Sequence, residues 1–274
     1  MSNIRVPMVS GRFYPNSRAA LEEMFSEFEQ THKKQLITNG ENIIGGIVPH
    51  AGYIYSGKHA ATFFSEIKEN LYDTAVILSP SHTGVGPVIS IDSHAGWQTP
   101  IGVLEADSEF IESNIFVKDS SAQEFEHAAE VIVPFIQHFC PKIPNVAVIT
   151  MRKQCFETAK TVANGLKQFT EISNKNILVI ASSDFNHFDS AEVGRRKDEN
   201  VIQKILSFDI EGVEKEVKKH RVSVCGYGPI MALMLYAQEV SEKAECKILS
   251  RGHSGEVAKS DSVVDYVSAA FFKA

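Results

Sequence analysis

Three histidines in this 274-residue chain follow short, continuous runs of apolar residues. The runs span residues 43–48, 74–78 and 177–181, and they precede His50, His82 and His187. Such runs are typical of strands buried on both faces of a sheet, and ligands bind beyond the carboxyl ends of parallel strands. Imidazole is the commonest metal ligand and the usual acid or base near neutral pH. Pro49 and Pro80 stiffen two of these turns, although each histidine alone can also be read as a hydrogen-bonded loop residue.

Cys225 is the cysteine with the most promising surroundings. It lies just before a predicted helix that begins at Pro229, and a helix N-terminus favours a thiolate. Gly226 and Gly228 allow a tight turn and close approach of a ligand. The alternative is a small buried apolar residue. No two of the four cysteines form a C-x-x-C pair, which excludes a zinc ribbon, and we expect no disulfides.

Further residues are candidates for contacts around a pocket. His127 and Glu130 are three apart, so on a helix they would share a face, either near a substrate or as a helix-start ion pair. Tyr53 and Tyr55 follow the first of the three histidines and are candidate pocket-wall residues, in a segment that lacks the phosphate-loop pattern. His253 also follows a predicted strand, and a pocket role is open for it.

The remaining pattern predicts one α/β domain over residues 1–274. Its sheet is expected to be central, mixed and mostly parallel, with helices on both faces, because apolar runs alternate with amphipathic stretches. A polar connection is expected at 33–42. Further strands are predicted at 88–91, 146–149, 247–249 and 263–271. Helices are predicted at 18–33, 57–70, 108–114, 128–139, 156–170, 191–207, 210–219 and 229–240.

Charge and composition argue against several functions. The formal net charge is −7, and basic residues form no concentrated stripe, so nucleic-acid binding is not expected. No stretch approaches the roughly 20 apolar residues that span a bilayer, and the first residues lack the apolar segment of a signal peptide. We therefore expect no membrane association and a cytoplasmic location.

Several motifs are spread along the chain. They are RVPMVSGRFYP at 5–15, PHAGYIYSG at 49–57, SPSH at 79–82, TPIG at 99–102, EH at 126–127 with Glu130 and Pro134, SSDF at 182–185 with His187, and CG at 225–226 with Pro229. Taken together, these motifs resemble those of the Memo-like family, called AmmeMemoRadiSam system protein B in prokaryotes. The resemblance covers essentially the whole chain, and the motifs occur in the family's order.

The family is similar in fold to extradiol dioxygenases that use non-haem iron(II). This resemblance implies that His50 and His82 are metal ligands, with Cys225 where the dioxygenases carry a carboxylate. It also implies that His187 is an acid/base residue, with Asp184 beside it. A thiolate is softer than a carboxylate and raises affinity for copper and zinc, so the expected site geometry does not require ring cleavage.

The sequence thus leads to a specific functional hypothesis. We expect a mononuclear metal site, with Fe²⁺ first and Cu or Zn as alternatives, in a redox enzyme acting on a small molecule or a peptide. Two alternatives are a metal-binding or metal-chaperoning protein without turnover and a peptide-binding module on the same fold. The prokaryotic family name implies a functional link to a radical-SAM protein.

Overall fold

A computed structural model describes residues 3–31, 42–68 and 71–273 of the chain. Its strands are β1 (Ile4–Arg5), β2 (Ile43–Val48), β3 (Thr74–Pro80), β4 (Ile89–Ile91), β5 (Gly96–Gln98), β6 (Val103–Ala106), β7 (Asn145–Met151), β8 (Ile177–Ser182), β9 (His187–Asp189), β10 (Ala244–His253) and β11 (Val263–Lys273). They form one sheet in the order β1-β5-β6-β7-β3-β8-β2-β11-β10, while β4 pairs with β7 and β9 pairs with β11.

The middle of the sheet is parallel and its margins are mixed. β6, β7, β3, β8 and β2 run parallel to one another, whereas β5 is antiparallel to β6 and β11 is antiparallel to β2 and to β10. The predicted fold class, a single-domain α/β protein with a mixed and mostly parallel sheet, is confirmed. The carboxyl ends of β2, β3 and β8 therefore lie together at one edge.

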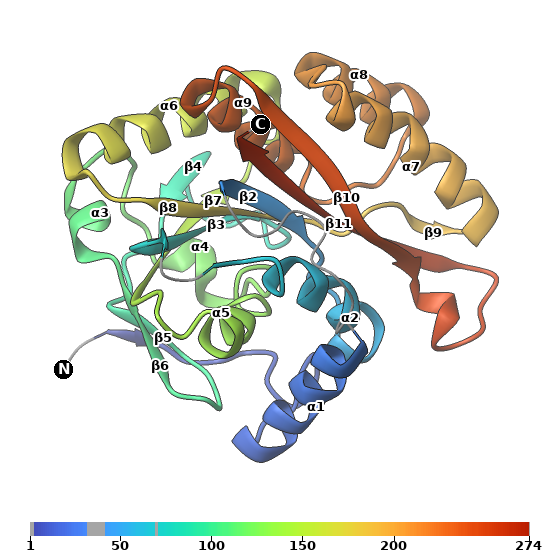
Figure 1. Cartoon of the computed structure of the whole chain (residues 1–274), viewed down its shortest axis with the longest axis horizontal. Coiled ribbons are helices and arrows are strands. Elements are labelled where there is room, and N and C mark those ends of the chain that lie inside the picture. Colours follow the sequence, from blue (N-terminus) through green and yellow to red (C-terminus); the bar gives the residue numbers. More distant parts are fainter. Residues whose placement is uncertain (1–2, 32–41, 69–70, 274) are drawn as a thin grey trace.

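Helices cover both faces of the sheet (Figure 1). They are α1 (Arg18–Thr31), α2 (Tyr53–Phe64), α3 (Ser108–Glu112), α4 (Ser121–Glu124), α5 (Val133–Phe139), α6 (Phe156–Ser173), α7 (Ala191–Leu206), α8 (Ile210–His220) and α9 (Tyr227–Val240), with a 3₁₀ turn η2 (Ser254–Glu256). On one face α9 packs against α6 and the central strands. On the other face α2 packs against β2, β10 and β11, and α1 and α5 pack on α2.

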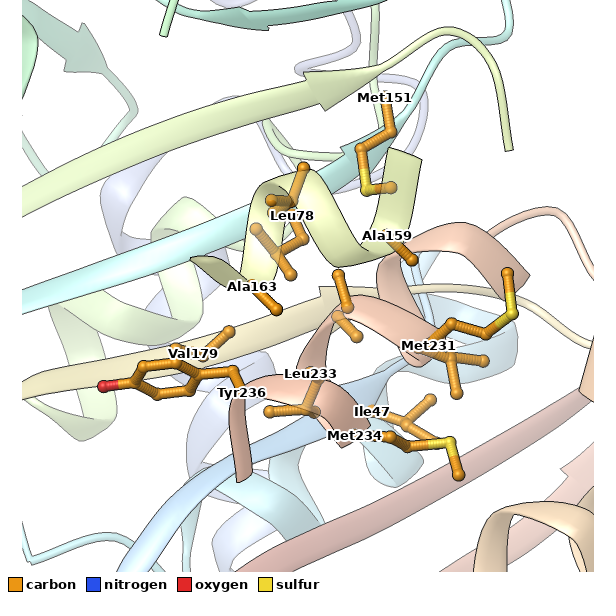
Figure 2. Packing of buried hydrophobic residues seen from close by; sticks show 14 of the residues in the cluster. Ile47, Leu78, Met151, Ala159, Ala163, Val179, Met231, Leu233, Met234 and Tyr236 are labelled. Atoms are coloured by element: carbon orange, nitrogen blue, oxygen red, sulfur yellow. The ribbon is translucent and has the colours of Figure 1, made fainter. Parts of the chain in front are cut away.

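The central strands are buried on both faces, as their continuous apolar runs predict. Val76 and Leu78 of β3 contact the cluster beneath α6 and α9, and Ala75 and Ile77 contact the cluster beneath α2 and α5. Figure 2 shows side chains of α6 and α9 packing over Leu78 and its neighbours. Burying one such aliphatic side chain contributes about 1.5–3 kcal/mol, so the core fixes the strands that end at the site.

Two predicted helices differ from the structure by several residues at their boundaries. The helix predicted at 57–70 begins at Tyr53 and ends at Phe64, and residues 69–70 lie outside those described. Gly57 lies inside this helix. A glycine is needed there because a Cβ would lie 2.5 Å from the ring of Phe28. It is a packing glycine and not a helix start.

The helix predicted at 128–139 begins only at Val133. Residues 128–132 form turns, and two of their carbonyl groups accept side-chain hydrogen bonds: Ala128 from Ser182 and Val131 from Tyr53. Most of the predicted connection at 33–42 and the end of the helix predicted at 18–33 lie outside the described residues. Among the helices that the structure describes, none combines the length and apolar character needed to cross a membrane.

Candidate metal site

His50, His82 and Cys225 meet at the carboxyl edge of the sheet. His50 follows β2, His82 follows β3, and Cys225 lies just before α9. The His50 and His82 ring centroids are 5.2 Å apart, and Cys225 Sγ is 3.3 Å from His50 Nε2. One potential ligand atom from each residue lies within 4.8 Å of the other two. The structure thus brings together the three residues that the sequence predicted as metal ligands.

The hydrogen bonds of His50 determine its tautomer. Ser182 Oγ donates to the Ala128 carbonyl over 2.7 Å, so it can only accept from His50 Nδ1, 2.8 Å away. His50 Nε2 is therefore left with its lone pair directed at the site. Burial, followed by the nearby charge of His82, holds the pKa of His50 well below its usual value. This ring is neutral and ready to act as a ligand.

Glu126 orients His82 in the same way. The carboxylate accepts from His82 Nδ1 at 2.8 Å and from the His82 backbone N–H at 2.5 Å, which leaves Nε2 facing the site. Burial alone would raise the pKa of Glu126, but the hydrogen bonds and charge of His82 lower it to about 2. A carboxylate behind a ligand histidine fixes the ring and raises its basicity.

Glu126 and His127 form a second close group with His82, within 4.8 Å. Glu126 already has several partners, because Oε1 accepts from His82 Nδ1 and from the backbone N–H groups of His127 and Ala128, while Oε2 accepts the His82 backbone N–H. In this structure Glu126 therefore supports the site as the hydrogen-bond partner of His82.

The thiol of Cys225 is held by the loop after β8. The Asp184 backbone N–H donates to Sγ over 3.1 Å, and the Cys225 N–H donates to the Asp184 carbonyl over 3.3 Å. Gly226 makes this approach feasible, since a Cβ there would lie 2.3 Å from the Ser182 carbonyl oxygen. Burial, and then the charge of Asp184, raises the pKa of the Cys225 thiol well above its usual value.

These residues fit a bound transition metal ion. Two imidazoles present lone pairs that their hydrogen bonds have already oriented, and an N₂S donor set suits iron, copper and zinc. The raised pKa of Cys225 describes a protein without metal, and a coordinated thiol is deprotonated. The His82 side chain is 35% exposed and that of His127 is 25% exposed, so the site opens to solvent on this side.

The structure places Asp184 in the loop that follows β8 and His187 at the start of β9. His187 Nδ1 is 2.8 Å from the carbonyl of Ser223, which can only accept, so Nδ1 carries a proton. Asp184 is buried, and its Oδ1 accepts the His50 N–H over 2.9 Å. Burial raises the pKa of Asp184 to about 6, although the charge of His187 and the His50 N–H oppose this shift.

The predicted substrate-contacting residues lie in different surroundings. The ring of His127 is 4.7 Å from that of His82 and 5.5 Å from that of His50, so it adjoins the site. Tyr53 is 1% exposed in the core, and its hydroxyl donates to the Val131 carbonyl. Tyr55 is half-buried in the first turn of α2.

His253 and Glu130, two further candidates from the sequence, have other surroundings. His253 lines a cavity of about 260 Å³ on the α7 side, whose lining includes none of the three candidate ligands. Glu130 does not pair with His127 across a helix, because the chain there forms turns. Its Oε2 lies 2.7 Å from Arg5 Nη1, so its ion pair is with the N-terminal segment.

Sequence reasoning missed Ser182 and gave Glu126 no role beyond its motif. Neither residue has a spacing that marks it, because each acts through a hydrogen bond to a histidine far away in the sequence. The available signal was position: Ser182 ends the apolar run before Asp184, at the same sheet edge as the histidines.

Comparisons with known proteins identify the family of the chain. The family model described as Memo-like protein matches residues 5–270. A MEMO1 family protein of Methanosarcina mazei is 37% identical over 97% of this chain and 98% of its own length. MEMO1 family proteins of Saccharolobus solfataricus and Metallosphaera sedula are 35% and 36% identical, each over 97% of this chain and 99% of their own lengths. The chain belongs to the Memo-like protein family.

Proposed function

We propose that this protein binds one transition metal ion through His50, His82 and Cys225 and uses it as a redox centre. The observation that carries the proposal is the approach of Cys225 Sγ to within 3.3 Å of His50 Nε2, the ring nitrogen whose lone pair faces the sulfur. Three potential ligands from distant parts of the chain meet here, and hydrogen bonds already orient two of them. Histidines that served only as hydrogen-bonded loop residues would not need to converge in this way. The expected substrate is a small molecule or a peptide.

Iron(II) is the first choice of metal because the site is open on its His82 side and keeps positions for other ligands. Bound iron would supply redox and Lewis-acid chemistry to a substrate held there. Copper and zinc are the alternatives, since the thiolate of Cys225 is a soft ligand.

His187 and Asp184 are the proposed proton-transfer residues. His187 Nδ1 is held by the Ser223 carbonyl, so its Nε2 can accept a proton and return it. The pKa of Asp184, raised to about 6, lies near the range in which a carboxyl group exchanges protons efficiently. General acid/base assistance of this kind is worth roughly 10²–10⁴-fold in rate.

The metal content of purified protein tests the proposal. We expect near-stoichiometric metal in protein prepared without air, and its loss in the double variant Cys225→Ser/His82→Ala. A matched double variant, Cys246→Ser/His138→Ala, changes the same residue types away from the site and should retain the metal. Full metal retention in the first double variant contradicts the proposed metal site. The redox role is tested separately, by measuring oxygen uptake by the iron-loaded wild-type protein.

The thiolate donor also favours a second candidate, a copper-binding or copper-transferring protein without turnover. Tight copper(I) binding that depends on Cys225, without oxygen uptake by the iron form, would favour this candidate. Peptide binding that persists in the presence of a chelator would instead favour the peptide-binding module.

A further inference from the structure

The turn that carries Cys225 is also held from β7, a strand that supplies none of the candidate ligands. Gln154 lies three residues beyond Met151, the end of β7. Its Nε2 donates to the Cys225 carbonyl over 2.6 Å, and its Oε1 accepts the Gly228 N–H over 2.8 Å. One side-chain amide thus connects both sides of the turn between Cys225 and α9.

Other contacts make this connection close and specific. The Tyr227 hydroxyl donates to the Gln154 carbonyl over 2.7 Å. A Cβ on Gly228 would lie 3.0 Å from Cβ and Cγ of Gln154, so a glycine there leaves room for the amide. The N-cap of α9 is Gly226, which has no side chain to satisfy the first N–H groups of the helix. Gln154, in the loop after β7, supplies an acceptor for one of these N–H groups, that of Gly228.

We propose that Gln154 is a positioning residue of the metal site, fixing the direction in which Cys225 presents its sulfur. This inference rests on the proposed function. A glutamine amide carries the donor that the Cys225 carbonyl needs and the acceptor that the Gly228 N–H needs. The loop after β8 holds the other side of the turn through the Asp184 N–H and Sγ. Without the Gln154 side chain, the Cys225 carbonyl and the Gly228 N–H lose this partner, and only the Tyr227 hydroxyl still joins this side of the turn to the Gln154 backbone. Metal binding must then order the carbonyl side of the turn.

Cobalt(II) titration of the purified protein without air tests this role, because a thiolate ligand gives cobalt a charge-transfer absorption. In Gln154→Met, which keeps the length of the side chain, we expect cobalt affinity to fall roughly 10-fold or more, as for other residues that orient ligands. The absorption per bound cobalt should also decrease. The control is Gln137→Met, because Gln137 likewise makes two hydrogen bonds, to Thr99 and Gly102, away from the site.

A second variant separates the hydrogen bond from folding. Gln154→Glu keeps an acceptor for Gly228 and places negative charge near the start of α9, which favours the helix. It cannot donate to the Cys225 carbonyl, so we expect weaker cobalt binding with little change in the unfolding midpoint of the metal-free protein. Wild-type affinity and absorption in both variants would overturn the inference. Failure of the wild-type protein to bind cobalt through a thiolate would instead count against the proposed function.

Discussion

Glu126 illustrates how much a single buried side chain contributes at this site. It is 0% exposed, yet it remains anionic because four N–H donors converge on its two oxygens. Two of these donors belong to His82, so the carboxylate fixes both the ring and the backbone of this candidate ligand. Any neutral replacement must leave at least one donor without an acceptor.

We therefore expect Glu126→Gln to destabilise the metal-free protein by about 1–3 kcal/mol, the usual effect of an unsatisfied buried donor. The glutamine amide offers one acceptor oxygen, while its NH₂ group faces another N–H. Urea unfolding measures the effect, and Glu124→Gln, an exposed change two residues away, should leave stability within about 0.5 kcal/mol of wild type. Equal stability of the two variants would argue against a buried, ionised Glu126.

Position marks His50, His82 and Cys225 as candidates, and the family resemblance implies that they are metal ligands. Two histidines follow apolar runs, and the cysteine precedes a helix start that includes glycines. Ser182 could not be assigned from the pattern, because its role depends on a hydrogen bond to a residue 132 positions away. The fold brings such hydrogen-bond partners together, and the spacing of apolar residues along the sequence does not reveal them.

At the scale of elements, the loop after β8 is fastened to β11 and α7 by a pair of buried acids. Asp198 of α7 accepts the Asn186 N–H over 3.1 Å, and the Asp265 N–H of β11 donates to the Asn186 carbonyl over 2.8 Å. Gly194 allows the approach, since a Cβ there would lie 2.1 Å from Asp265 Oδ2. Burial, and then the charge of Asp265, raises the pKa of Asp198 to about 8.

This pair predicts a stability that depends on pH. The folded-state pKa of Asp198 exceeds its unfolded value of 3.8, so the folded protein holds an extra proton between about pH 4 and pH 8. The stabilisation is complete below about pH 4 and is lost as pH rises to about 8. Asp198→Asn removes this titration while its amide can still donate to Asp265.

We expect the stability of Asp198→Asn, relative to wild type, to increase by about 1 kcal/mol or more between pH 5 and pH 8. Urea unfolding at both pH values measures the difference, and the exposed change Asp261→Asn on the β10–β11 connection is the control. A difference between variant and wild type that stays constant with pH would show that Asp198 is ionised throughout.

The sequence predicted most long elements well, except that the strand predicted at 247–249 spans Ala244–His253, and it predicted the short elements poorly. β1, β5, β6 and β9 contain two to four residues each and were not predicted, because they lie at margins of the sheet and carry no apolar run. The late start of α5 has a different cause. Carbonyl groups before Val133 bind side chains of Ser182 and Tyr53, and this tertiary use overrides local helix preference.

At the scale of the whole molecule, the N-terminal segment is anchored beneath the site by Arg5. This residue is 3% exposed, pairs with Glu130 over 2.7 Å, and donates to the carbonyl groups of Gln123 and Glu126. Its guanidinium also lies 4.4 Å from the centre of the Trp97 ring. The segment that carries Glu126 is therefore held from a strand more than 100 residues away in the sequence.

Arg5→Met should destabilise the protein by about 3–5 kcal/mol, because it leaves the buried Glu130 charge without its partner. Arg18 and Glu22 form the matched exposed pair, at 2.8 Å, and Arg18→Met should cost about 1 kcal/mol or less. Unfolding curves of the two variants under the same conditions make the comparison. Similar losses would mean that the Arg5–Glu130 pair is no more important than a surface ion pair.

The separation of the donors along the chain has a consequence for biosynthesis. His50 and Cys225 are 175 residues apart, with His82 between them. During translation both imidazoles emerge long before the sulfur, so an ion captured early would meet nitrogen donors alone. If this chain binds the proposed metal, selection of a thiophilic ion would thus be postponed until late in synthesis, when most of the polypeptide has already left the ribosome.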